Sequence, residues 1–311
     1  MNRRQTVPAK QKYTIQDFDR EFPTEDACLE YVKEKRWPDG RTMCVTCKAE
    51  RKHYRVSGRT AYACHACGNH IFPLAGTIFH KSSTSLRTWF YVLRLMSSTR
   101  VGVSAKHIQR ETGVTYKCAW RMMKQVRTLM GETIKLSSPV EMDEGFFGGS
   151  DSNKPAHLRG KSKTPILGIV ERHGKVVARV IPDTSKGSIL PVVAEVLHPR
   201  TMIYTDRSAT LEQVRWMGQS HKHATVNHSK GYKNGYAHTN SIDGFWSLVK
   251  RGIQGVYYQV GLDYLQSYLN EFSFRYNRRN VMRPMFSQLV ERTTMQVCPS
   301  AREQKLLALR S

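Results

Sequence analysis

The sequence predicts an α/β protein whose largest part is a mixed sheet, preceded by a small cysteine-containing module and a small all-α region. Three observations divide the 311-residue chain in this way. Four cysteines in two pairs lie before residue 80, apolar residues recur at helical spacing over 85–131, and strand-like apolar runs begin near residue 136. The expected parts are 1–13, 14–80, 81–135, 136–280 and 281–311.

The charge of the chain indicates a polyanionic partner. Lysine and arginine number 49 against 25 aspartates and glutamates, which gives a formal net charge of +24. Such an excess is typical of proteins that bind nucleic acid. No apolar run reaches the length of a membrane-spanning helix, and the basic segment 1–13, expected to be disordered, has no apolar stretch behind it as a secretory signal would. We therefore expect a cytoplasmic, nucleoid-associated protein that binds DNA and no membrane.

Two CxxC pairs predict a zinc ribbon within residues 14–80. Cys44 and Cys47 form the first pair, and Cys64 and Cys67 form the second after sixteen intervening residues. Each pair can place two thiolates on one tetrahedral ion, and strand-like runs lie between the pairs. A closed shell of four sulfurs holds one structural Zn²⁺ ion rather than a catalytic one. The alternative, four unrelated buried thiols, does not account for the paired spacing.

Helical patterns occur on both sides of the cysteines. A short helix over 24–36, with Thr24 as its N-cap, precedes them. Three helices are expected within 81–135, and the order short helix, glycine turn, longer basic helix is typical of a helix-turn-helix. We interpret the basic stripe of the last helix, 116–130, as a DNA-facing surface; the alternative is the solvated face of a three-helix bundle. The stripe consists of Lys117, Arg121, Lys124 and Arg127.

Residues 136–280 switch from helical to strand patterns. Three apolar runs joined as a meander precede a helix over 188–197 and a fourth run. Three strands in meander, then helix, then strand is the opening of a ribonuclease-H-like fold. Two amphipathic helices, 241–251 and 262–277, complete this part before a tail with no chemical signal. The strands are expected over 139–147, 164–170, 175–181 and 200–205.

Three aspartates in this part point to phosphodiester chemistry. Asp143 lies inside the first predicted strand, Asp206 follows the fourth, and Asp243 opens the helix over 241–251. Carboxylates gathered at one point bind hard divalent cations, which relieve the repulsion between them. Two such ions can activate a nucleophile and stabilise the leaving oxygen of a phosphodiester. The three acids therefore predict a site for two Mg²⁺ or Mn²⁺ ions.

The residues around these aspartates also have purely structural interpretations. Asp143 could cap a strand end, and Asp243 could complement the dipole of its helix. Glu141 shares the face of Asp143, and we interpret it as an exposed residue at the start of the strand, with a supporting role behind the site as the alternative. Glu144 is expected on the opposite face, and Trp246 in the core.

Short motifs spread over most of the chain are more specific together than any one of them. The N-terminal ones are Phe22-Pro-Thr24, Arg36-Trp-Pro-Asp-Gly40 and the four cysteines. The others are Met142-Asp-Glu144, Gly148-Gly149, Thr205-Asp206, His238-Thr-Asn240, Gly244-Phe-Trp246, Lys250-Arg-Gly252 and Phe274-Arg-Tyr-Asn277. In these motifs the chain resembles a DDE transposase of a bacterial insertion sequence, of the subgroup with an N-terminal zinc ribbon and a ribonuclease-H-like catalytic domain.

The resemblance implies roles for individual residues. Asp143 and Asp206 match the first two catalytic acids and would bind the magnesium ions. The third acid is usually Glu in such enzymes, but Asp243, shorter by one methylene, stands at the matching position. Asn240 lies about one turn earlier, and either residue or both would complete the site. Lys250, seven positions after Asp243, shares its helical face and would bind DNA phosphates beside Arg251.

The resemblance also implies a reaction and its partners. The protein would bind the terminal inverted repeats of its element, nick the ends with water and join the 3′ hydroxyls to target DNA. Pairing of two ends implies a dimer or higher multimer in the complex with double-stranded DNA. Two alternatives stay open: a catalytically inactive DNA-binding regulator derived from such an enzyme, and a structure-selective nuclease without strand transfer.

Overall fold

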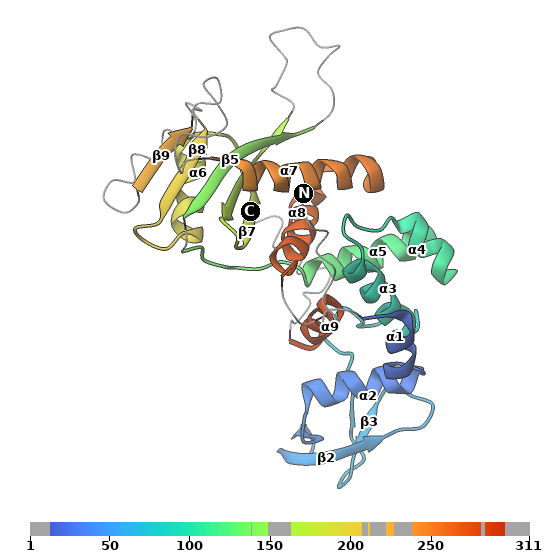
Figure 1. The fold of residues 1–311 in the computed structure, drawn as a ribbon. Coiled ribbons are helices and arrows are strands. Elements are labelled where there is room, and N and C mark those ends of the chain that lie inside the picture. Colours follow the sequence, from blue (N-terminus) through green and yellow to red (C-terminus); the bar gives the residue numbers. More distant parts are fainter. Residues whose placement is uncertain are drawn as a thin grey trace. The chain divides into compact units, whose positions relative to one another are not determined.

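The protein consists of two compact units of mixed α and β structure (Figure 1). The computed structural model describes residues 13–137, 139–148, 163–206, 211, 222–226, 238–280 and 284–295. The first unit takes its described residues from 13–99, 103–129 and 284–295, and the second takes them from 100–102 and 130–280. The predicted zinc ribbon and helical region therefore share one unit. Nearly all of the predicted tail at 1–13 lies outside the described residues.

Two helices and a four-stranded antiparallel sheet open the first unit. Helix α1 (Ile15–Glu21) was not expected, although Thr14 and Asp17 form a capping box at its start. Helix α2 (Glu25–Arg36) begins at the predicted cap, where the Thr24 hydroxyl accepts the Ala27 N–H at 3.2 Å. The strands follow in chain order as β1 (Arg41–Cys44), β2 (Ala49–Arg55), β3 (Tyr62–Cys64) and β4 (His70–Ile71).

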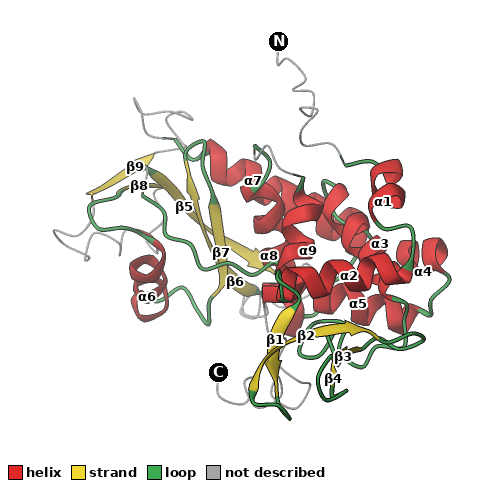
Figure 2. Ribbon diagram, turned by 90° about the horizontal axis from the view of Figure 1, so that it is seen from below, coloured by secondary structure: helices red, strands yellow, loops and turns green. Residues whose placement is uncertain are grey.

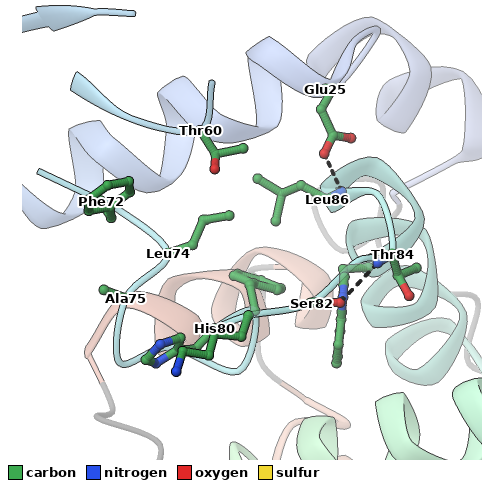
Figure 3. Close-up of a pocket in the computed structure, with 12 residues that line it drawn as sticks. Glu25, Thr60, Phe72, Leu74, Ala75, His80, Ser82, Thr84 and Leu86 are labelled. Carbon is green, nitrogen blue, oxygen red and sulfur yellow. Dashed lines mark hydrogen bonds between the residues drawn. The ribbon is translucent and has the colours of Figure 1, made fainter. Parts of the chain in front are cut away.

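The three predicted helices that follow the ribbon are present. They are α3 (Leu86–Ser98), α4 (Ala105–Thr112) and α5 (Tyr116–Thr128). Gly113 ends α4 in the left-handed conformation, at φ 71°, as the predicted glycine turn requires. The carboxylate of Glu25 accepts the N–H group of Leu86 at 2.6 Å (Figure 3) and that of Arg87 at 3.0 Å. This contact fixes the start of α2 to the start of α3.

The far end of the chain completes the first unit. Helix α9 (Met285–Met295) packs against α2 and α3, so these residues are not a separate tail. Its Phe286 ring lies 6.0 Å from the ring of Phe18 and 5.9 Å from that of Phe22, measured between centroids. The apolar face of α9 is thus part of the core of this unit.

The second unit is built on a five-stranded mixed sheet in the order β7-β6-β5-β8-β9. The meander of three antiparallel strands is as predicted, and β8 and β9 extend it in parallel on the other side of β5. Because β5 and β8 run in parallel, the carboxyl end of β8, Asp206, lies at the same end of the sheet as the C-terminal half of β5. The strands are β5 (Val140–Phe147), β6 (Thr164–Glu171), β7 (Val176–Val180), β8 (Met202–Asp206) and β9 (Lys222–Val226).

Helices cover both faces of this sheet (Figures 1 and 2). Helix α6 (Lys186–Val196) buries Ile189 and Val193 against one face. Helix α7 (Asn240–Gly252), continued by a π-helical segment η4 (Ile253–Tyr257), and helix α8 (Leu262–Asn277) cover the other face. No helix among the described residues is long and apolar enough to cross a membrane.

The start of α6 differs from the prediction. The helix begins two residues earlier than 188, after Ser185. The hydroxyl of Ser188 does not cap the helix and instead donates to the Asp183 carboxylate at 2.7 Å. The predicted bounds of α8 are confirmed.

Candidate active site

The four cysteines come together at the knuckles of the ribbon. Their sulfur atoms all lie within 4.8 Å of one another, with Cys44 3.5 Å from Cys67 and Cys47 3.9 Å from Cys64. Four thiolates around one Zn²⁺ ion, each with a bond of about 2.3 Å, would be about 3.8 Å apart. The Cys47 N–H, directed at the Cys44 sulfur, is the largest influence that lowers the pKa of Cys44 to about 6, whereas the Cys67 sulfur and burial raise the pKa of Cys47 to about 12. The arrangement fits a structural zinc site.

Asp143 lies mid-strand on β5, and other acids surround it. Burial is the largest influence on its carboxyl group, and it raises the pKa of Asp143 to about 7 together with the negative charges nearby. Those charges belong to Asp206, Glu144 and Asp243, in falling order of effect. The structure therefore brings the two other predicted acids within electrostatic reach of Asp143.

Asp206 ends β8, where one oxygen of its carboxylate is inaccessible to solvent. This Oδ1 atom has no hydrogen-bond partner among the described residues. A buried carboxylate oxygen is costly unless it is paired or binds a cation. The orphaned oxygen and the raised pKa of Asp143 together fit a site that takes up positive charge.

A cleft of about 550 Å³ lies beside Asp143 and α7. Its lining includes Asp143 and Asp243, and also the two basic residues predicted to bind DNA phosphates, Lys250 and Arg251. Asp243, Lys250 and Arg251 are all solvent-exposed, so a large substrate can reach them. One cleft thus holds Asp143 and Asp243 together with Lys250 and Arg251, whereas Asp206 is not among its lining residues.

Trp246 joins the helix to the strand at the base of this cleft. Its indole N–H donates to the Asp143 carboxylate at 3.0 Å and lowers the pKa of Asp143, against the stronger raising effects. Its ring lies over Gly168 on β6, where an added Cβ would stand 2.5 Å from the ring. Trp246 is buried, as predicted, but sequence reasoning missed its contact with Asp143.

Other predicted or neighbouring residues are placed differently. Asn240 is the first residue of α7, is exposed and does not line the cleft, whereas Asp243 does. Glu144, expected on the far face of β5, also lines the cleft. Among the residues that the structure describes, only the four cysteines gather three or more metal-ligand atoms closely enough to suggest an ion.

Glu141 corrects one interpretation of the sequence. It was expected as an exposed residue at the start of the strand, but its side chain is 0% exposed. The isolated strand pattern gives no sign of this burial, because the groups that cover Glu141 come from distant parts of the chain: Arg172 and Ser241. Its contacts indicate a supporting role and are described below.

Two stretches of the chain match models of known protein families. Residues 135–277 match the model of the ISXO2-like transposase domain, and residues 23–70 match that of a transposase zinc-ribbon domain. Together the two stretches cover more than half of the chain. The chain belongs to the transposases with a zinc ribbon and an ISXO2-like domain.

Two relatives of this transposase carry similar names. An uncharacterised protein of the transposable element ISH50 from Halobacterium salinarum is 26% identical over 275 residues, which are 82% of this chain and 91% of that protein. An uncharacterised transposase-like protein from Haemophilus influenzae is 28% identical over 109 residues, or 34% of this chain and 85% of that protein. The first relative is thus similar over most of both chains, and the second over about a third of this chain.

The two matched stretches of the transposase correspond to distinct structural parts. The first runs from α2 to the start of β4, and the second spans the sheet of the second unit with α6, α7 and α8. Helices α3 to α5 lie between the matched stretches. Their part in the transposase therefore has to be argued from the structure.

The basic stripe of α5 is shorter than predicted. Lys117 and Arg121 are exposed and Lys124 is half-buried, but Arg127 is 2% exposed and cannot face DNA. A helix turns by about 100° per residue, so Arg127, ten residues after Lys117, lies about 80° round the helix from it. Arg127 therefore lies on the buried side of α5, next to the buried Val126.

A second cavity of the transposase, about 300 Å³, lies between the ribbon and α3 (Figure 3). Its lining is largely apolar, with Phe72, Leu74 and Leu86 among its residues. Arg121 reaches its rim, where the guanidinium donates to the Ser82 hydroxyl at 3.3 Å. Glu25 is the only carboxylate among its lining residues, and it caps α3. The cavity therefore offers no carboxylate cluster for catalysis.

Proposed function

We propose that this transposase cleaves the terminal inverted repeats of its element and joins the 3′ ends to target DNA, in a reaction that depends on divalent metal ions. The observation that carries the proposal is the cleft lined by Asp143 and Asp243 together with Lys250 and Arg251. A strand order with three antiparallel strands followed by parallel neighbours supports a ribonuclease-H-like fold for the second unit. Double-stranded DNA is the partner, and the pairing of two ends requires a dimer or higher multimer.

Asp143 and Asp243 in the cleft, with Asp206 near Asp143, carry the oxygen ligands that Mg²⁺ or Mn²⁺ prefers. Asp143, Asp206 and Asp243 would hold two ions through carboxylate oxygens, the ligands that hard cations prefer. When bound, such ions activate the attacking hydroxyl and stabilise the leaving oxygen of the phosphodiester. Asp143 would give up its proton as positive charge arrives, because its raised pKa reflects burial and neighbouring anions.

Basic residues in the cleft and on α5 would hold the DNA. Lys250 lies two turns of α7 beyond Asp243, so a phosphate bound to its ammonium group lies along the same helical face as the acid. Arg251 follows it in the same cleft. Lys117, Arg121 and Lys124 of α5 form the second proposed DNA-binding surface, in the helix-turn-helix region.

Strand transfer with matched element ends tests this function. The full-length protein should join pre-cleaved ends to a target plasmid in Mg²⁺ or Mn²⁺, and Asp143→Ala and Asp206→Ala should abolish joining while both variants still bind the ends. Retained joining in either variant would refute the catalytic assignment. Tight, salt-sensitive binding with no cleavage in either metal would favour the DNA-binding regulator instead.

The third position of the site is tested separately. We propose that Asp243, which lines the cleft, is the third ligand, and that the exposed Asn240 is not. Asp243→Asn should then reduce joining far more than Asn240→Ala does. Asp243→Glu tests the shorter reach of this residue, and a gain in rate would indicate a weakened ligand in the natural protein.

A further inference from the structure

Glu141 is a fully buried carboxylate in the strand that carries Asp143. The two side chains are two positions apart on β5, so they point to the same face of the sheet. Glu141 has no exposed surface, and a buried charge of this kind is tolerated only when it is paired and hydrogen-bonded. Its partners therefore show what the residue does.

The first partner of Glu141 is the start of helix α7. Its Oε2 atom accepts the N–H groups of Ser241 and Ile242 at 2.7 and 3.2 Å, and the Ser241 hydroxyl donates to its Oε1 atom at 3.2 Å. The residue before the helix, Thr239, makes no side-chain cap of its own. Free N–H groups at a helix start need acceptors, and a negative charge there is favourable. Glu141, from a strand 100 residues earlier in the chain, supplies both.

The second partner of Glu141 is Arg172, which follows β6. Its Nε atom donates to Glu141 at 3.0 Å, and its Nη2 atom donates to the carbonyl oxygen of His238 at 2.9 Å, just before α7. The guanidinium carbon also lies 4.0 Å from the centre of the Tyr204 ring on β8. Tyr204 is the β8 residue paired with Glu141 and stands two positions before Asp206.

These contacts connect the three elements that carry the aspartates. Glu141 is two residues from Asp143 on β5, it holds the helix start two residues from Asp243, and through Arg172 it reaches the strand that ends in Asp206. Replacing a buried ion pair by apolar residues is often neutral or stabilising, so global stability alone does not explain this pair. Its geometry instead fixes the alignment of α7 relative to β5.

We infer that Glu141 and Arg172 are positioning residues for the active site. They hold the first turn of α7 so that the Asp243 carboxylate faces Asp143 across the cleft. Neither residue is among those that line the cleft. The catalytic part of this inference rests on the proposed function, whereas the alignment of α7 does not.

Glu141→Gln in the full-length protein tests the inference, because the amide keeps the shape and loses the charge. Hydrogen exchange at the Ser241 and Ile242 amides should become faster by about tenfold or more, since a charged acceptor is replaced by a neutral one. At saturating DNA, joining of pre-cleaved ends should slow by about 10- to 100-fold, and the Kd for those ends should stay the same.

Glu271→Gln is the matched control. Glu271 is also 0% exposed in the second unit and is bonded to Arg275 and Tyr257, away from the first turn of α7. The control should leave both the exchange at Ser241 and Ile242 and the joining rate close to wild type. If Glu271→Gln slows joining as much as Glu141→Gln, the effect is general destabilisation and the inference fails.

The two proposals fail in different ways. If the wild-type protein joins no ends, the proposed function fails, and the exchange at Ser241 and Ile242 alone decides the positioning role. If the wild type is active and Glu141→Gln joins ends at the wild-type rate, the positioning role fails. If Glu141→Gln does not fold, Arg172→Lys is the second variant. It keeps the positive charge but loses the guanidinium group that donates to both Glu141 and the His238 carbonyl. The same slower joining at unchanged Kd is expected, and joining at the wild-type rate would refute the inference.

Discussion

At the scale of one residue, the surroundings of Asp143 make its ionised form unfavourable unless a cation is bound nearby. Burial and three neighbouring carboxylates oppose its ionisation, and the indole N–H of Trp246 favours it. A carboxyl group with a pKa raised to about 7 is partly protonated at neutral pH. Its ionised form becomes favourable when a cation binds, which links metal binding to the protonation of this group.

The raised pKa predicts that Asp143 destabilises the metal-free protein at high pH. Because the pKa is about 7 in the fold and 3.8 in its ordinary state, the folded protein binds this proton more tightly between those values. The free energy of unfolding should therefore fall as pH rises from about 4 to 7. Asp143→Asn removes this loss and should stabilise the metal-free protein by about 2–4 kcal/mol at pH 8, measured by denaturant unfolding in EDTA.

The control is the same comparison of unfolding free energies, wild type against Asp143→Asn, made at pH 4. At pH 4 both proteins carry a neutral group at this position, so the stability difference should largely vanish. A difference that is equal at pH 4 and pH 8 would show that ionisation of Asp143 is not its cause.

Helix α8 illustrates at the scale of one element how side chains complete the edge of a sheet. Strand β7 is an edge strand, and two amides of α8 pair with its backbone. Gln266 accepts the Val180 N–H at 2.8 Å and donates to the Ala178 carbonyl at 3.0 Å. Asn277 does the same at Val176, accepting at 2.7 Å and donating at 3.1 Å. These bonds satisfy an edge that would otherwise invite pairing with another chain.

Gln266→Ala should destabilise the second unit. The substitution removes the partners of one backbone N–H and one carbonyl, which predicts a loss of about 1–3 kcal/mol by urea unfolding. Ser267→Ala, the next residue of α8, loses only a bond to the Tyr264 carbonyl and is the matched control. An equal loss in the two variants would mean that the edge contacts contribute no special stability.

Local patterns predict elements well and long-range partners poorly. The start of α2 follows from Thr24, and the bounds of α8 follow from its periodicity, because both signals lie within a few residues. Asp143 and Asp243 could be assigned to one site from their motifs and predicted elements. The burial of Glu141 could not, because its partners Arg172 and Ser241 are 31 and 100 residues away.

Helix α9 shows at the scale of the whole molecule that chain order and spatial order differ. The chain leaves the first unit after α5, builds the second unit, and returns to supply α9. Besides the aromatic contacts of Phe286, Arg292 donates to the Leu129 carbonyl at 2.8 Å. Segments from before and after the second unit in the sequence therefore stabilise the first unit together, and its core includes buried residues of α9.

Phe286→Ala tests this dependence. Phe286 is 3% exposed and contacts three aromatic rings, so its removal should cost about 3–5 kcal/mol. Met295→Ala on the same helix is the control, because Met295 is 75% exposed and should change stability little. Thermal unfolding of the two variants would contradict this account of α9 if their melting temperatures were the same.

The most direct test of the proposed active site is the rate of strand transfer by Asp143→Asn protein loaded on pre-cleaved ends in Mg²⁺. This variant keeps the shape of the side chain and is predicted to be the more stable protein without metal, so misfolding would not account for lost activity. We predict unchanged DNA binding and a joining rate lower by about 1,000-fold or more. Joining within tenfold of the wild-type rate would show that Asp143 does not hold a catalytic metal ion.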